Sequence, residues 1–282
     1  PKKWADLWLK EGFASYMSYV ALNSIHREYQ MMDTFTVLEF EASMELDGSN
    51  SSHAISFDVQ TTNDVSRLFD AITYSKACIL LRMLNSFVGE EAFRDAMRDL
   101  LQTNAYGNID RRDLWQYMSK HAHLKNTLPE DMHIENIMEP WITKPGYPVI
   151  SVQRDGINIV VSQERYLLPH RNLSDETRWD IPITFETSEL HKGDSIPTHW
   201  LTQADQQITI TDVFTSARTA PNVSLYLNLN RQGYYRVNYD TESWLALKEN
   251  FGSLPKITRA QILDDALNLA QAEFLTYDIP LT

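Results

Sequence analysis

The sequence predicts an α+β multidomain protein. Three observations support this fold class: apolar residues recur at helical spacing from residue 5 to about 145, apolar and polar residues alternate from Tyr147 to Asp240, and helical spacing returns afterwards. A chain of 282 residues is long enough to form two or three hydrophobic cores. These changes of period divide the chain into three predicted domains, 1–145, 146–240 and 241–282.

The first of these regions predicts stacked amphipathic helices. In the segment 7–22, apolar residues lie on almost every face of the expected helix, which predicts a helix buried in the middle of a domain. Asp110 is placed as an N-cap, Gly89 as a helix end and Pro145-Gly146 as a stop. The predicted helices are 7–22, 27–45, 65–87, 90–101, 111–122 and 130–143.

The middle region predicts a β-sandwich. Arg154-Asp155-Gly156 lies between two alternating segments and is typical of a hairpin turn. Regularly spaced strands with turn residues between them favour a sandwich. The predicted strands are 149–152, 157–161, 179–187, 198–202, 207–211, 223–229 and 233–239, and the helices that follow are 241–251 and 258–274.

The composition excludes some classes of partner. The formal net charge of −13 and the isoelectric point near 5.0 argue against nucleic acid. No apolar run approaches the roughly 18 residues of a membrane span, so membrane association is expected only through segments outside this chain. One cysteine, Cys78, excludes an internal disulfide.

The segment from Trp4 to Tyr16 carries the strongest chemical signal. It places one carboxylate, Glu11, among aromatic and aliphatic residues. An ionised Glu in such surroundings needs a cationic partner, and a metal ion is the strongest candidate. The simpler alternative is a helix-interior Glu that reaches solvent or pairs with a buried Arg.

The pattern around Glu11 resembles the third-ligand segment of the M1 family of zinc aminopeptidases, W-x-D-L-W-L-N-E-G-F-A. Further similarities follow in the family's order, at 70–76, 81–84, Trp141 with 146–150, and 233–239. The resemblance implies the C-terminal helical part of a thermolysin-like catalytic domain at 1–145, a β-sandwich domain at 146–240 and the start of an α-helical domain at 241–282.

The resemblance also implies a Zn²⁺ site with Glu11 as one ligand. In the family, H-E-x-x-H supplies two histidines and the general base, and G-x-M-E-N supplies the acidic residue that holds the substrate's free amine. Neither pattern occurs in the 282 residues. The family spacing puts the second His about nine residues before Pro1. We therefore expect this chain to be inactive alone.

Tyr74 resembles the family's catalytic tyrosine, whose hydroxyl stabilises the oxyanion formed at the scissile carbonyl. The alternative is a buried core tyrosine bonded to a backbone carbonyl. Asp6 fits an N-cap better than a residue that orients a zinc-bound histidine. The sequence departs from the family at Lys10, usually Asn, at Ala77-Cys78 and at Ser52-His53-Ala54.

A rival metal site is offered by His121 and His123. Their spacing places the two rings on different helix faces, so we interpret them as solvated residues at a helix end.

The function expected from these features is that of part of a zinc-dependent aminopeptidase, which hydrolyses N-terminal residues from peptides that have a free N-terminus. The alternative is a non-catalytic cell-surface receptor or binding module of the same fold, and a plain interaction sandwich joined to unrelated helices is the third hypothesis. The possible partners include a second copy of the same chain, which would form a homodimer. The resemblance and the N-x-[ST] sequons at Asn50, Asn172 and Asn222 favour an extracellular or secreted location over a cytoplasmic one.

Overall fold

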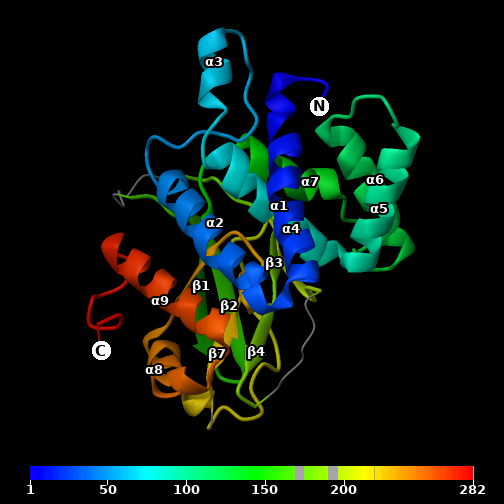
Figure 1. Ribbon diagram of the computed structural model, residues 1–282. Coiled ribbons are helices and arrows are strands. Elements are labelled where there is room, and N and C mark those ends of the chain that lie inside the picture. Colours follow the sequence, from blue (N-terminus) through cyan, green and yellow to red (C-terminus); the bar gives the residue numbers. More distant parts are fainter. Residues whose placement is uncertain (169–174, 190–195, 219, 282) are drawn as a thin grey trace. The chain divides into compact units, whose positions relative to one another are not determined.

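The chain forms two compact units, Pro1–Gly146 and Tyr147–Thr282 (Figure 1). The computed structural model describes residues 1–168, 175–189, 196–218 and 220–281. The first unit is helical, whereas the second combines strands with helices, so the predicted α+β class is confirmed. The assignment of 146–240 and 241–282 to separate domains stays a prediction.

Helices build the first unit, and most of them begin and end near the predicted residues. Figure 1 shows α1 beside α4, and α5 beside α6, and both pairs are in contact. Asp110 caps α6 by accepting the amides of Arg112 and Asp113, as predicted. The elements are η1 (Trp4–Asp6), α1 (Leu7–Ile25), η2 (Arg27–Tyr29), α2 (Met31–Asp47), α3 (Thr62–Arg67), η3 (Ile72–Lys76), α4 (Ala77–Val88), α5 (Glu90–Thr103), α6 (Arg111–Leu124) and α7 (Ile134–Thr143).

The single helix predicted for 65–87 is wrong. The chain instead forms the short helix α3, a bend, the π-helical turn η3 and then α4. The physical cause is Asp70, whose Oδ1 accepts the amides of Ile72 at 2.9 Å and Thr73 at 3.1 Å and so starts a new helical segment. Apolar spacing is continuous across this break, which is why the sequence pattern conceals it.

The prediction that the first helix is buried all round is only half correct. Its buried residues end at Tyr16, and Met17 and Ile25 are 46% and 72% exposed. On α2, Phe35 is fully buried while Leu38 is 53% exposed. The two helices therefore carry more apolar residues than their contacts with α4 and η3 can bury.

The second unit contains one four-stranded sheet, in the order β6-β2-β1-β8, and two two-stranded ladders, β3-β5 and β4-β7. The predicted hairpin is confirmed: β1 pairs antiparallel with β2, and Gly156 has the positive φ of +64° that the turn requires. Strand β8 pairs parallel with β1. The strands are β1 (Pro148–Asp155), β2 (Asn158–Arg165), β3 (Ile181–Ile183), β4 (Phe185–Thr187), β5 (His199–Leu201), β6 (Gln207–Ile210), β7 (Leu225–Leu227) and β8 (Arg236–Tyr239).

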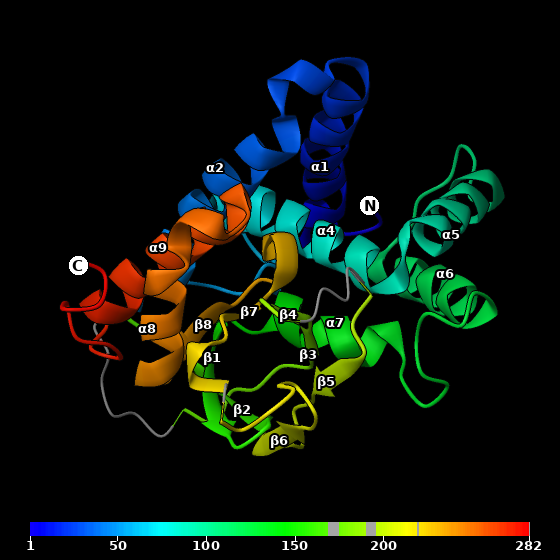
Figure 2. The same ribbon diagram turned by 90° about the horizontal axis from the view of Figure 1, so that it is seen from below.

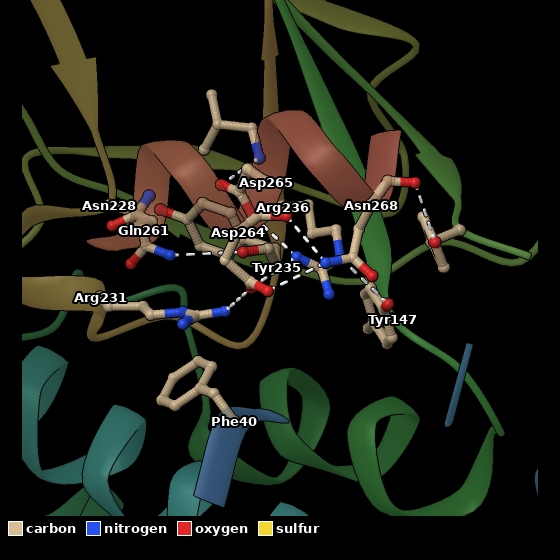
Figure 3. Close-up of polar contacts among 12 residues, drawn as sticks. Phe40, Tyr147, Asn228, Arg231, Tyr235, Arg236, Gln261, Asp264, Asp265 and Asn268 are labelled. Carbon is tan, nitrogen blue, oxygen red and sulfur yellow. Dashed lines mark hydrogen bonds and ion pairs between the residues drawn. The ribbon is translucent and has the colours of Figure 1, made fainter. Parts of the chain in front are cut away.

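Two helices, α8 (Thr241–Glu249) and α9 (Lys256–Gln271), lie together beside the strands (Figure 2). Buried charges join α9 to the sheet (Figure 3). Arg236 on β8 donates to Asp264 at 2.7 Å and to Asp265 at 3.1 Å, and Arg231 donates to Asp264. Burial raises the pKa of Asp265 to about 6. The end of β8 and the middle of α9 are thus held by one ionic cluster.

Two predicted features concern cellular location. Among the helices in the described residues, none is both long and apolar enough to cross a membrane. The sequon residues Asn50 and Asn222 are exposed, whereas the sequon at Asn172 lies outside the described residues.

Candidate active site

Glu11 lies near the start of α1, with its side chain 15% exposed. Its Oε1 is 3.0 Å from Nζ of Lys10, whose side chain is 61% exposed. The carboxylate thus has a cation nearby, but this cation is a solvated lysine and not the buried arginine that we considered from sequence. Burial does not hold Lys10 in this position, which leaves Glu11 able to accept another partner.

Tyr74 lies on the π-turn η3, half-buried. The turn forms because Ala71 O accepts two amides, from Ser75 at 2.9 Å and from Lys76 at 3.0 Å. Burial raises the pKa of the Tyr74 hydroxyl, and the negative charge of the nearby Glu11 carboxylate raises it further. The structure therefore brings together the two residues that the sequence selected for the site.

A glycine permits this approach. Gly12 on α1 faces the start of α4, where a Cβ added to it would lie 2.9 Å from Cβ of Ala77 and 3.2 Å from its carbonyl carbon. Only a residue without a side chain allows the two backbones to come so close. Because Glu11 precedes Gly12 and η3 precedes Ala77, the same contact places Glu11 beside Tyr74.

Asp6 does not cap the helix, contrary to our preference. It occupies the N-cap position of α1, but its side chain makes no capping bond. It is buried, and its Oδ1 accepts from Arg111 at 3.1 Å. The guanidinium of Arg111 also donates to Glu139 at 2.8 Å, so Asp6 and Glu139 share one cation, which lies far from Asp6 in the sequence.

The rival histidines do not form a shared site. Nε2 of His121 is 2.8 Å from Asp99, and Nε2 of His123 is 2.9 Å from the carbonyl of Met132. Both side chains are half-buried, so the prediction that they are solvated was wrong although their different orientations were expected. The i, i+2 spacing sends each ring to its own partner.

Three residues at the two ends of η3 had no role predicted from the sequence: Asp47, His53 and Lys76. Asp47 and Lys76 form a fully buried ion pair, and His53 bonds to Asp70 at the start of η3. A signal for the first pair was present, since Lys76 lies among apolar residues of the helix predicted for 65–87 and so required a buried anion. Its partner could not be identified from the pattern alone.

The described residues offer only part of a metal site. Across 1–168, 175–189, 196–218 and 220–281, no three His, Cys, Asp or Glu side chains come together in a group that could hold a metal ion. Glu11 fits the role of one oxygen ligand, because it is largely buried and its neighbouring ammonium is free to move into solvent.

Comparisons with known proteins identify the family. Residues 1–141 match the Peptidase family M1 domain, and residues 224–282 match the ERAP1-like C-terminal domain. The chain belongs to peptidase family M1. It is 35% identical to Aminopeptidase N of Homo sapiens and 34% identical to Aminopeptidase Ey of Gallus gallus, over 99% of its own length in each case. It is also 32% identical to the Thyrotropin-releasing hormone-degrading ectoenzyme of Homo sapiens. The chain spans between a quarter and a third of the length of these M1 relatives.

Proposed function

We propose that this chain is part of a zinc-dependent aminopeptidase that hydrolyses N-terminal residues from peptides with a free N-terminus. The observation that carries the proposal is the close approach of Gly12, next to Glu11, to Ala77, next to the turn that carries Tyr74, in a chain whose residues 1–141 match the Peptidase family M1 domain. Zn²⁺, when bound, would supply the Lewis acidity that polarises a scissile carbonyl.

The residues of this chain have separate tasks in that proposal. Glu11 would hold the metal with one carboxylate, and other ligands would come from segments outside the 282 residues. Tyr74 would donate its phenolic proton in a hydrogen bond to the oxyanion that develops during attack on the carbonyl. A tyrosine hydroxyl is protonated at neutral pH, and burial together with the nearby Glu11 raises the pKa of Tyr74 further. The 282 residues alone are proposed to be inactive.

A single hydroxyl deletion tests the catalytic role. In the complete protein that carries this chain, Tyr74→Phe should retain zinc and lose on the order of 100- to 1000-fold in kcat, as for other oxyanion donors. Tyr19→Phe is the matched control, because Tyr19 on α1 donates to Glu39 at 2.8 Å and should leave kcat unchanged. Undiminished turnover of Tyr74→Phe would remove Tyr74 from the mechanism.

The contact of Lys10 with Glu11 favours one rival function. A carboxylate 3.0 Å from an ammonium is neutralised without a metal, as a non-catalytic receptor or binding module of the same fold would allow. The two proposals differ in zinc content. For the enzyme, the complete protein should bind about one zinc and Glu11→Gln should lower its zinc affinity strongly, while a protein without zinc in either form supports the binding module.

We propose an extracellular location, and the name of one relative supports it, since that human protein is called an ectoenzyme. The exposed sequon residues Asn50 and Asn222 would then be open to glycosylation. Peptides are the proposed partners, with membrane association only through segments outside this chain. Treatment of the natural protein with a glycosidase tests this location, because an unchanged mass would argue against secretion.

A further inference from the structure

The π-turn that carries Tyr74 is held at its N-terminal end by two side chains. Asp70 accepts the amides of Ile72 and Thr73 with Oδ1, while its Oδ2 lies 2.7 Å from Nε2 of His53. His53 belongs to the loop before α3, and its other ring nitrogen, Nδ1, is 2.8 Å from the carbonyl of Ala54. Both ring nitrogens of His53 therefore face acceptors, which only the doubly protonated imidazolium satisfies.

The C-terminal end of the same turn is held by a buried ion pair. Nζ of Lys76 is 2.8 Å from Oδ2 of Asp47, the last residue of α2, and neither side chain is exposed to solvent. Lys76 also donates to the carbonyl of Gly146 at 3.0 Å, while Asp47 accepts the amide of Gly146 at 2.8 Å and the hydroxyl of Ser52. The pair is thus hydrogen-bonded on both partners, as a buried charge requires.

These contacts at both ends of the π-turn fix the direction of the Tyr74 side chain. A π-turn contains one residue more than an α-helical turn and occurs rarely, mostly as a single turn and often at functional sites. If the segment relaxed to regular α-helix, side chains before the extra residue would rotate by about 100° relative to α4, because each residue of an α-helix turns by that amount. The Tyr74 side chain would then point in a different direction.

We propose that the pairs His53–Asp70 and Asp47–Lys76 are positioning residues that clamp the two ends of this turn and so aim the Tyr74 hydroxyl at the reacting carbonyl. The inference rests on the proposed aminopeptidase function. Since the hydroxyl acts on the transition state, loss of a clamp lowers kcat and leaves KM unchanged.

The test uses His53, because its environment has a close match elsewhere in the first unit. His53 is 16% exposed and pairs with Asp70, and His121 is 12% exposed and pairs with Asp99 at 2.8 Å. In the complete protein, His53→Leu should lower kcat roughly 10- to 100-fold, the scale expected for a small misplacement. Zinc content and KM should stay unchanged, and His121→Leu should leave kcat unchanged.

Two further measurements separate positioning from general stability. His53→Gln keeps a donor near the Nε2 position and should restore most of the lost kcat. The groups that face His53 are Asp70, whose hydrogen bond raises the pKa of His53, and Arg67, which lowers it. Because neutral His53 with its proton on Nε2 still donates to Asp70, as Gln would, kcat should change little as pH rises through the pKa of His53. Amide exchange at 72–76 should be faster only in His53→Leu.

The outcomes distinguish this inference from the proposed function. An active wild-type enzyme with unchanged kcat in His53→Leu, or with equal losses in His121→Leu, overturns the positioning role alone. A complete protein that binds no zinc and hydrolyses no peptide overturns the proposed function, and the positioning role falls with it.

Discussion

The close contact between α1 and α4 makes Gly12 the most informative position to change. In Gly12→Ala, the new methyl group would lie 2.9 Å from Cβ of Ala77 and 3.3 Å from Cδ1 of Leu81. The carbonyl carbon of Ala77, at 3.2 Å, belongs to the backbone and cannot rotate away. The two helices must therefore separate to accept the substitution.

The expected change in the free energy of unfolding is the difference between a steric cost and a gain in helix propensity. Overpacking a well-packed core by one methyl group typically costs about 1–3 kcal/mol. Replacing glycine by alanine within a helix returns about 1 kcal/mol through helix propensity. We therefore expect Gly12→Ala to lower the free energy of unfolding of the first unit by about 1 kcal/mol.

The assay has to read the first unit separately from the second. Denaturant-dependent hydrogen exchange on peptides from 1–146 does so, because the chain contains two compact units and a single transition cannot be assumed. Ala14→Gly, at an exposed position of the same helix, measures the propensity term by itself. Ala77→Gly removes the methyl group that Gly12 faces, and the double variant Gly12→Ala/Ala77→Gly should recover about 1 kcal/mol relative to the sum of the single changes.

Gly12→Ala should not stabilise the unit by the amount that Ala14→Gly destabilises it. That result would show that no steric conflict exists at Ala77. A double variant whose effect equals the sum of the single effects would refute the specific contact between the two methyl groups.

Three further predictions concern the first unit. Lys76→Met should destabilise it by about 3–5 kcal/mol, because Asp47 is left charged in a dry site, and Asp47→Leu/Lys76→Met should cost less; both are measured by denaturant unfolding. Asp110→Ala should cost about 1 kcal/mol, since two capped amides lose their acceptor, and circular dichroism melting checks it. The bond from Asp70 raises the pKa of His53 in the folded chain above the ordinary 6.5, so its stabilisation is complete below pH 6.5 and is lost as pH rises through the folded value. His53→Gln should flatten that part of the profile of unfolding free energy against pH.

The predicted elements that succeeded had local signals. Asp110 precedes an amphipathic segment, which predicts an N-cap, and the structure confirms the cap and adds a capping box with Asp113. Gly156 lies between two alternating segments and adopts the positive φ of a hairpin turn. Such signals need only neighbouring residues, so a sequence pattern can contain all of the information.

The failures came from side-chain contacts that hydrophobic periodicity does not report, one of them local and the others between residues far apart in the sequence. Helical spacing continues through 65–87, and the break arises from hydrogen bonds to the side chain of Asp70 that no periodicity reports. Asp6 was interpreted as a cap because its partner, Arg111, lies far along the chain. Glu11 and Tyr74 were selected by family resemblance, but the approach of the two elements that carry them depends on Gly12, whose role is visible only when α1 and α4 are packed.

The ionic cluster on α9 has a practical consequence for truncating this protein. A natural place to cut would be after Asp240, where strands give way to helices. Such a cut would remove Asp264 and Asp265 but keep Arg231 and Arg236, whose side chains are only 5% and 3% exposed. Two guanidinium groups would then lose their carboxylates within the remaining piece, and it should aggregate or misfold. Shortened versions for crystallisation should therefore retain α9 together with β8.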